Sequence, residues 1–384
     1  MTTFRRRIVI VFGTRPEIIK LSGIVQRLGW AAALVHSGQH WDDTMSGVFL
    51  RDLGLGKPHH TLEIGGLTRG EQIGEATAAL SRLLAELQPD VVVVQGDTNS
   101  ALSGALAANA CHIAVAHVEA GLRSYDREMP EEHNRVLIDH LADLCFAPTK
   151  VSAANLEREG IPASRIVVTG NTIVEAVGRL VPDEEARAAL LDQYGLERNR
   201  YILATIHRPE NTDGEKLGEV LAALGSLPLP AVFPLHPRTA KMVERAGLEA
   251  LLAPLVVVEP LAYEPFLGLL AECALSVSDS GGVQEEVSVL GRPVVVVRRS
   301  TERPEVQGIW ATLADSGPAL TAAVDSLLAD LPAVHRQLEE LVSPYGDGGA
   351  SRHCVDAIQR LLAGRSPAPA TAPTPTPAGP AAAH

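Results

Sequence analysis

The strongest constraint on the fold is a regular alternation of short β-branched runs with longer helical patterns, in two series. The first series has candidate strands at 8–12, 33–37, 91–95, 113–118, 144–147 and 166–169. After a charged, helical segment at 182–200, a second series follows at 201–206, 231–235, 255–258, 275–278 and 293–297. Strands that alternate with helices are typical of parallel sheets with crossover helices. The sequence therefore predicts an α/β protein of two Rossmann-like domains.

The gap between the two series gives the expected domain boundaries. We place an N-terminal Rossmann-like domain at 1–172 and a C-terminal one at 173–345. A helix expected at 346–365 would pack back on the N-terminal domain. The last residues, 366–384, are almost wholly Pro, Ala and Thr. Such a segment cannot bury enough apolar surface to offset its ordering entropy, so we expect it to be a disordered tail.

Charge and hydropathy exclude several classes of protein. A net charge of −13 over 384 residues, with no basic stripe, argues against a nucleic-acid partner. The longest apolar runs, such as 91–94 and 293–297, are far shorter than the roughly 20 residues that span a bilayer. The apolar run after the N-terminal charges lacks a small-residue cleavage site and reads as a buried strand. Four scattered cysteines without metal-type spacing fit a reducing compartment, so we expect a cytoplasmic protein.

Unusually polar residues follow the candidate strands of both halves. In the first half these are Arg15 after the first strand, Asp97 after the strand at 91–95, and Glu119 followed by Glu131 and Arg135 beyond the strand at 113–118. In the second half, His207, His236 and Ser280-Gly281-Gly282 follow the strands at 201–206, 231–235 and 275–278. Because ligands of open parallel sheets bind beyond the carboxyl ends of the strands, we expect an elongated anion in the cleft between the domains.

The way in which an anion could be bound is also constrained. The chain has neither G-x-x-x-x-G-K-[ST] nor a complete G-x-G-x-x-G after its first strand, which disfavours P-loop hydrolysis and a standard dinucleotide site. Ser280-Gly281-Gly282 at the start of a helix can instead cradle a phosphate with backbone N–H groups. Arg15, His207, His236 and Arg303 could neutralise a diphosphate, and Glu286 could accept hydrogen bonds from ribose hydroxyls.

Each of these residues also has a purely structural interpretation. Asp97 could cap the following helix, and Asp279 or Ser280 could be an N-cap. Glu131 and Glu132, taken in isolation, are typical of the solvated start of a helix. The cysteines are typical of small core residues. The functional interpretation is favoured because both halves place their unusual residues at the same edge.

Nine motifs together resemble the non-hydrolysing UDP-N-acetylglucosamine 2-epimerases. They are GTRPEIIK (13–20), GQH (38–40), QGDT (95–98), HVEAGLRS (117–124), MPEEHNR (129–135), GNT (170–172), IHRPEN (206–211), DSGGVQEE (279–286) and TERPE (301–305). The resemblance implies a GT-B fold, a homodimer, and no metal or nicotinamide cofactor. It also implies interconversion of UDP-GlcNAc and UDP-ManNAc by elimination of UDP to a 2-acetamidoglucal and re-addition on the other face.

The same resemblance implies roles for individual residues. Asp97, Glu119 and Glu131 match the acid/base carboxylates, and His207 matches the histidine near the leaving diphosphate. The expected substrate-binding residues are Arg15, Lys20, Arg135, His236, Phe266 beside the uracil, Ser280, Gly281, Gly282, Glu286 and Arg303. Gln39 and His40 match a segment that in many members helps to bind a second, activating UDP-GlcNAc.

Four other functions fit the same residues less directly. A hydrolysing relative would release ManNAc and UDP, and the same epimerisation could act on a modified UDP-N-acetylhexosamine. A GT-B glycosyltransferase would need fewer carboxylates in the first domain. A UDP-sugar sensor would bind tightly without turnover. Exchange at sugar C2 separates the epimerase from the sensor, and free UDP identifies the hydrolase.

Overall fold

Runs of Val, Ile and Leu form the strands of two parallel sheets in the computed structural model, which describes residues 7–39, 50, 53–315 and 317–364. The first sheet has the order β3-β2-β1-β4-β5-β6-β7, and the second has the order β10-β9-β8-β11-β12-β13. The strands of the first sheet are β1 (Ile8–Phe12), β2 (Ala32–His36), β3 (His60–Thr61), β4 (Val91–Gln95), β5 (Ala114–Val118), β6 (Leu144–Ala147) and β7 (Ile166–Val168). Those of the second are β8 (Ile202–Thr205), β9 (Ala231–Pro234), β10 (Val256–Val258), β11 (Leu275–Ser278), β12 (Val294–Val296) and β13 (Ala311–Leu313).

The two Rossmann-like halves predicted from the sequence are therefore confirmed, and each predicted strand is present to within a residue or two. The prediction missed the edge strands β3 and β13. β3 has two residues, and β13 reads Ala-Thr-Leu with two of its three residues exposed. Neither strand has the β-branched run that marks a buried strand, because an edge strand is covered on fewer sides.

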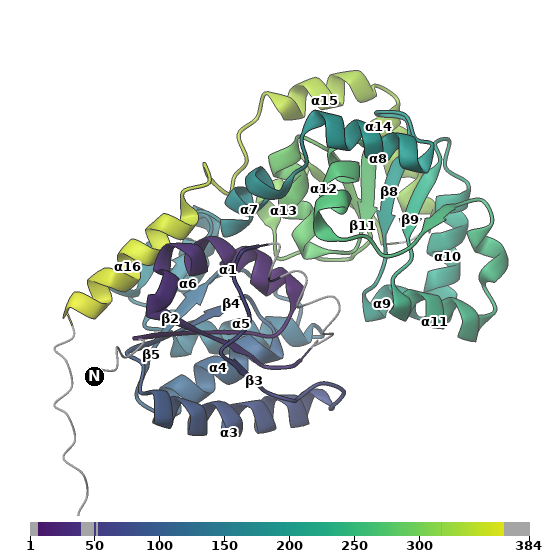
Figure 1. Ribbon diagram of the computed structural model, residues 1–384. Helices are drawn as coiled ribbons and strands as arrows, with labels where there is room; N and C mark the ends of the chain where they lie inside the picture. The colour runs from purple at the N-terminus through teal and green to yellow at the C-terminus, as the bar shows by residue number, and fades with distance from the viewer. Residues whose placement is uncertain (1–6, 40–49, 51–52, 316, 365–384) are drawn as a thin grey trace, which may run out of the picture.

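Helices connect the strands and cover both faces of each sheet (Figure 1). In the first half they are α1 (Arg15–Leu28), α3 (Arg69–Leu87), α4 (Asn99–Ala110), α5 (Pro130–Leu141) and α6 (Lys150–Arg158). In the second half they are α8 (Glu184–Tyr194), α9 (Pro209–Thr212), α10 (Gly214–Gly225), α11 (Pro237–Ala246), α12 (Tyr263–Glu272), α13 (Gly281–Leu290), α14 (Gly317–Leu328) and α15 (Leu331–Glu339). None of the helices in these described ranges has the length and apolar character needed to cross a bilayer.

The apolar core follows from the two-residue period of the strands. Ile8, Ile10 and Phe12 of β1 enter one buried cluster, whereas Val9 and Val11 enter another on the opposite face. Because helices cover both faces, both sets are buried, and each such side chain contributes about 1.5–3 kcal/mol of hydrophobic stabilisation. This packing fixes the strands whose carboxyl ends carry the polar residues.

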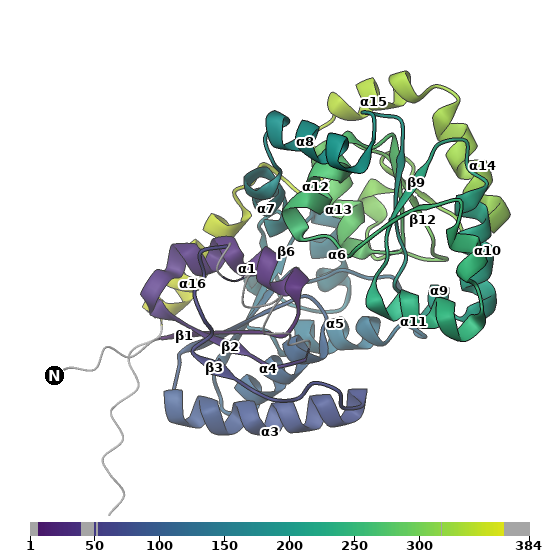
Figure 2. The same ribbon diagram turned by 45° about the vertical axis from the view of Figure 1, so that its right-hand side comes forward.

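Two helices join the halves. α7 (Thr172–Leu180) packs against α1 of the first half and against α12 and α13 of the second. α16 (Ala350–Gly364), the yellow helix in Figures 1 and 2, returns from the second half and lies against α1 and α7. Because α7 contacts both halves, the division at residue 172 stays a prediction. The expected disordered tail at 366–384 lies outside the described residues.

Candidate active site

A cavity of about 700 Å³ opens between the two sheets, at the carboxyl ends of their strands. In the first sheet β1 and β4 are neighbours although β2 and β3 intervene in sequence, and in the second sheet β8 and β11 are related in the same way. Such reversals of strand order are where open α/β sheets bind ligands. The loops after β1, β4, β8 and β11 all contribute to the wall of this cavity.

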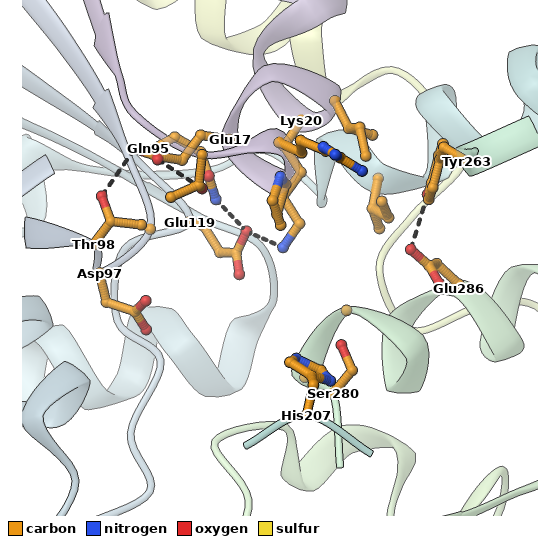
Figure 3. A pocket seen from close by; sticks show the side chains of 18 of the residues that line it. Glu17, Lys20, Gln95, Asp97, Thr98, Glu119, His207, Tyr263, Ser280 and Glu286 are labelled. Carbon is orange, nitrogen blue, oxygen red and sulfur yellow. Dashed lines mark hydrogen bonds and ion pairs between the residues drawn. The ribbon is translucent and has the colours of Figure 1, made fainter. Parts of the chain in front are cut away.

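The structure gathers most of the predicted site residues in this cavity, as Figure 3 shows for several of them. Those lining it are Arg15, Lys20, Asp97, Glu119, His207, Phe266, Ser280, Gly281, Gly282, Glu286 and Arg303. Glu131, Arg135, His236 and Gln39 are not among the lining residues, and His40 lies outside the described residues. No group of three His, Cys, Asp or Glu side chains in the described ranges has the arrangement of a metal site.

Glu119 is held by cations from both halves of the molecule. Its carboxylate accepts hydrogen bonds from Lys20 at 2.5 Å, from Gln95 at 2.7 Å and from Arg303 at 3.0 Å. The backbone of Glu119 has φ +70°, a left-handed conformation that a non-glycine residue adopts at a cost of about 1–3 kcal/mol. The three hydrogen bonds offset this strain, and they fix the carboxylate at the edge of the cavity.

Arg303 connects this carboxylate to two more from the second half. Its guanidinium contacts Glu285 at 2.7 Å and also pairs with Glu302. Lys20 completes the cluster through Glu285 at 2.7 Å. Burial opposes ionisation of Glu285, but Arg303 and Lys20 outweigh it and lower its pKa, whereas burial and the Glu285 charge raise the pKa of Glu119. Glu119 is therefore the carboxylate of this pair that takes up a proton more readily.

Asp97 is oriented by Arg135, which the sequence assigned to substrate binding. The Arg135 guanidinium, 2% exposed, donates to one oxygen of Asp97 from Nε at 3.0 Å and from Nη2 at 2.6 Å. Its Nη1 contacts Glu132 at 2.9 Å. The buried neighbour Glu132, and not the half-buried Glu131, thus anchors the start of α5. Arg135 reaches the cavity only through Asp97, which itself lines the wall.

The start of α13 forms the opposite wall, next to His207 (Figure 3). A Cβ on Gly281 would lie 2.5 Å from Nη1 of Arg303, so glycine here leaves room for the guanidinium. Ser280 is the N-cap but makes no side-chain capping bond, while the preceding Asp279 binds His207 at 3.0 Å. The first residues of α13 thus line the cavity, and the N-terminus of a helix carries the free N–H groups that an anion site requires.

Two further residues line the cavity although the sequence did not single them out: Tyr263 in the second half and Glu17 in the first. Tyr263 of α12 donates a hydrogen bond to Glu286 at 2.9 Å, and burial raises the pKa of Glu286 to about 7. Glu17 accepts from Thr14 at 2.8 Å and from Thr98, which follows Asp97, at 2.9 Å. No sequence signal marked Tyr263. Glu17 occupies the capping-box position of α1, which normally predicts an exposed carboxylate.

The remaining predicted residues lie outside the cavity wall. His236 is the exposed N-cap of α11, with its ring 6.2 Å from that of His207. Gln39 accepts hydrogen bonds from the backbone and the hydroxyl of Ser100, on the first turn of α4. In the structure Gln39 therefore contacts the N-terminus of α4. Its expected role in binding an activator stays a prediction.

Glu17 gives a prediction for stability. Burial raises its pKa from 4.5 to about 7, so between these pH values the folded chain keeps a proton that the unfolded chain releases. The free energy of unfolding therefore falls as pH rises, by about 2–3 kcal/mol for such a shift. Glu17→Gln, which stays neutral, should gain that amount over the wild type between pH 4.5 and pH 8 in urea unfolding.

Glu71→Gln is the matched control, because Glu71 holds the same capping-box position on α3 but is exposed. Hydrogen bonds from Thr68 lower the pKa of Glu71, so its contribution to stability grows as pH rises. The Glu71 variant should therefore lose stability relative to the wild type over the same pH range. An equal change for both variants would show that Glu17 titrates as an ordinary surface carboxylate.

Fold and site together define the class of protein: two facing Rossmann-like halves, with carboxylates from the first and the N-terminus of α13 from the second at one cavity between them. A family model described as UDP-N-acetylglucosamine 2-epimerase matches residues 25–359. The chain belongs to this family. Its GT-B fold, predicted from the sequence, is confirmed by solved structures of family members.

Three relatives illustrate the similarity. A Methanococcus maripaludis UDP-N-acetylglucosamine 2-epimerase is 37% identical over 364 residues, which are 92% of this chain and 98% of that protein. The crystal structure of the Methanocaldococcus jannaschii UDP-GlcNAc 2-epimerase in complex with UDP-GlcNAc and UDP matches with a TM-score of 0.81 and 37% identity, covering 93% of this chain and 99% of that one. A Pseudomonas aeruginosa UDP-2,3-diacetamido-2,3-dideoxy-D-glucuronate 2-epimerase is 36% identical over 92% of this chain and all of that protein.

Proposed function

We propose that this protein interconverts UDP-N-acetylglucosamine and UDP-N-acetylmannosamine by inverting C2 of the sugar, without hydrolysis. The observation that carries the proposal is a single cavity in which Asp97 and Glu119 face His207 and the N-terminus of α13. Proton-transfer groups on one wall and anion-binding groups on the other are what an elimination from a sugar diphosphate needs.

The reaction needs the carboxylates and the anion-binding groups at the same time. The C2 proton of the sugar is not activated by a carbonyl, so its removal has to be coupled to departure of UDP from C1. One carboxylate takes the C2 proton while the electron pair of the C1–O bond leaves with the diphosphate, which gives a 2-acetamidoglucal. Protonation of C2 from the opposite face and return of UDP to C1 then give the other epimer. Asp97 and Glu119 supply the carboxylates, with Glu131 as a third candidate.

The second half would hold the leaving group. The N–H groups of Gly281 and Gly282 at the start of α13 can donate to the diphosphate, with Ser280, Arg15 and His207 at the same cavity. Glu286, oriented by Tyr263, can accept from the ribose hydroxyls. Phe266 lines the cavity from α12, the helix that also carries Tyr263, and is the candidate to pack on uracil. This route requires no cofactor. The homodimer implied by the resemblance and the cytoplasmic location expected from the cysteines are part of the same proposal.

Turnover in heavy water tests the proposal. Starting from UDP-GlcNAc in D₂O, NMR of the reaction mixture should show deuterium at C2 of both UDP-GlcNAc and UDP-ManNAc. Product without C2 exchange would reject proton transfer at C2. Stoichiometric UDP with free ManNAc would identify the hydrolysing reaction instead, and tight binding with no exchange would identify a sensor.

The Pseudomonas aeruginosa relative raises a second candidate substrate. Its name specifies a UDP-sugar with two acetamido groups and a C6 carboxylate, and it is nearly as similar to this chain as the UDP-GlcNAc epimerases are. A side-by-side measurement of kcat/KM on UDP-GlcNAc and on that diacetamido uronate decides between the two substrates. We expect the higher value for UDP-GlcNAc.

A further inference from the structure

His207 and Asp279 end neighbouring strands of the second sheet. Thr205 of β8 pairs with Ser278 of β11, so the residues that follow them emerge side by side. The Asp279 carboxylate is fully buried, whereas the side chain of His207 is 44% exposed and lines the cavity. A buried carboxylate therefore lies directly behind an imidazole that faces the substrate.

The two oxygens of Asp279 share the backbone N–H of His207 and differ in their other partners. Oδ2 accepts the backbone N–H groups of His207 at 3.0 Å and of Arg208 at 2.8 Å, and the side-chain amide of Asn211 at 3.2 Å. Oδ1 lies 3.0 Å from Nδ1 of the His207 ring and also accepts the backbone N–H of His207 at 3.3 Å. Oδ2 thus anchors the loop after β8, and Oδ1 is the oxygen that contacts the imidazole.

We propose that Asp279 is a positioning residue for His207, which keeps hydrogen on Nδ1 and presents Nε2 to the diphosphate that leaves C1. This inference rests on the proposed function. An ionised carboxylate can only accept hydrogen bonds, so the ring nitrogen opposite Oδ1 has to carry the hydrogen. Within the described residues, Nε2 of His207 has no hydrogen-bond partner in the protein, and it belongs to a side chain in the cavity wall.

The electrostatics of the pair agree with this geometry. Burial opposes ionisation of Asp279, but the hydrogen bond and charge of His207, together with the backbone N–H groups of His207 and Arg208, outweigh it and lower the pKa of Asp279. The carboxylate therefore stays ionised and remains a hydrogen-bond acceptor for the ring. When the ring is an imidazolium, Nε2–H donates to a diphosphate oxygen as the C1–O electron pair departs, and Asp279 takes no proton.

A purely structural role for Asp279 makes a different prediction. As an N-cap it would bind the first turn of α13, but Ser280 is the N-cap and Asp279 binds the loop after β8 instead. As a loop anchor it would need only the backbone contacts of Oδ2. The contact between Oδ1 and Nδ1 is the part that a loop anchor does not require.

Asp279→Asn separates the two roles. The amide oxygen of Asn can keep the hydrogen bonds from the backbone N–H groups of His207 and Arg208, which leaves its NH₂ opposite Nδ1. Because NH₂ only donates, Nδ1 has to become the acceptor and the ring hydrogen moves to Nε2. We expect kcat to fall by about 10²–10⁴-fold, the usual range for a lost acid/base group, while KM changes only a few-fold.

Nitrogen-15 NMR of the histidine rings reads the tautomer directly, without turnover. The His207 signal is identified by its absence in His207→Gln among the 13 histidines of the chain. In the wild type it should show a protonated Nδ1, and in Asp279→Asn a neutral ring with hydrogen on Nε2. Asp213→Asn, at the exposed N-cap of α10 a few residues away, is the matched control and should leave rate and tautomer unchanged.

Two results would overturn the inference. One is a wild-type His207 ring with hydrogen on Nε2 alone, which needs no variant and so does not depend on the folding of Asp279→Asn. The other is an Asp279→Asn enzyme whose kcat stays within about threefold of the wild type. If the wild type turns over no UDP-sugar, the proposed function fails, yet the NMR result still decides whether Asp279 sets the tautomer.

Discussion

Asp97→Asn should lower the rate of epimerisation by about 10²–10⁴-fold with little change in the affinity for UDP, because an amide cannot take up or return a proton at neutral pH. Asp97 lines the cavity, and two hydrogen bonds from Arg135 orient its carboxylate. The variant keeps the size of the side chain, and Arg135 keeps Glu132 as a partner at 2.9 Å. The loss should therefore be chemical, with the fold retained.

The measurement is C2 exchange in D₂O, started separately from each epimer, with UDP binding followed by calorimetry. If Asp97 serves one face of the sugar, Asp97→Asn should suppress exchange more strongly from one starting epimer than from the other. That asymmetry would assign the base for each direction. Asp90→Asn is the matched control, since Asp90 precedes the same strand at its opposite end and pairs with Arg7 at 2.6 Å. A rate within tenfold of the wild type would exclude Asp97 from proton transfer.

The sequence predicted the location of the site well because a parallel sheet sends all its carboxyl ends to one edge. Asp97, Glu119 and His207 each follow a strand whose residues are almost all buried, so the strand fixes where the backbone emerges. The strand order could not be read from the chain, but the outcome did not depend on it, because neighbouring strands end at the same edge whatever their order.

The sequence could not predict which residue each side chain contacts. Arg135 is long enough to reach either substrate or Asp97, and only the packing of α5 decides in favour of Asp97. Glu17 and Glu71 hold the same capping-box position, yet one is buried against Thr98 and the other is exposed. Burial and the choice of partner arise from tertiary packing, so a local motif carries no information about either.

Replacement of Arg303 by Met should have the largest effect on stability, because Arg303 is a buried cation shared by three carboxylates. It contacts Glu119 at 3.0 Å, Glu285 at 2.7 Å and also Glu302, and all four side chains are buried. Removal of one partner from a buried ion cluster leaves uncompensated charge and costs about 3–5 kcal/mol. We expect urea unfolding of Arg303→Met at pH 7 to show a loss of that size.

The loss should also depend on pH in a defined direction. Arg303 lowers the pKa of Glu285 and of Glu302 against the effect of burial, and this stabilisation is present above the unfolded-state pKa and lost as pH falls. Without Arg303 the two carboxylates take up protons more easily. The difference between wild type and variant should therefore shrink between pH 7 and pH 4, and Glu302→Gln added to Arg303→Met should restore part of the stability at pH 7.

Arg299→Met is the matched control, since Arg299 lies four residues away, is exposed, and faces Asp315 only at 3.9 Å. An exposed pair of this kind contributes about 0–1 kcal/mol. If both variants lose less than about 1 kcal/mol, water must reach the cluster and screen its charges. Glu119 would then be solvated as well. Burial could in that case not explain why Glu119 takes up a proton more readily than Glu285. The stability of Arg303→Met thus also tests the electrostatic basis of the proposed proton transfer.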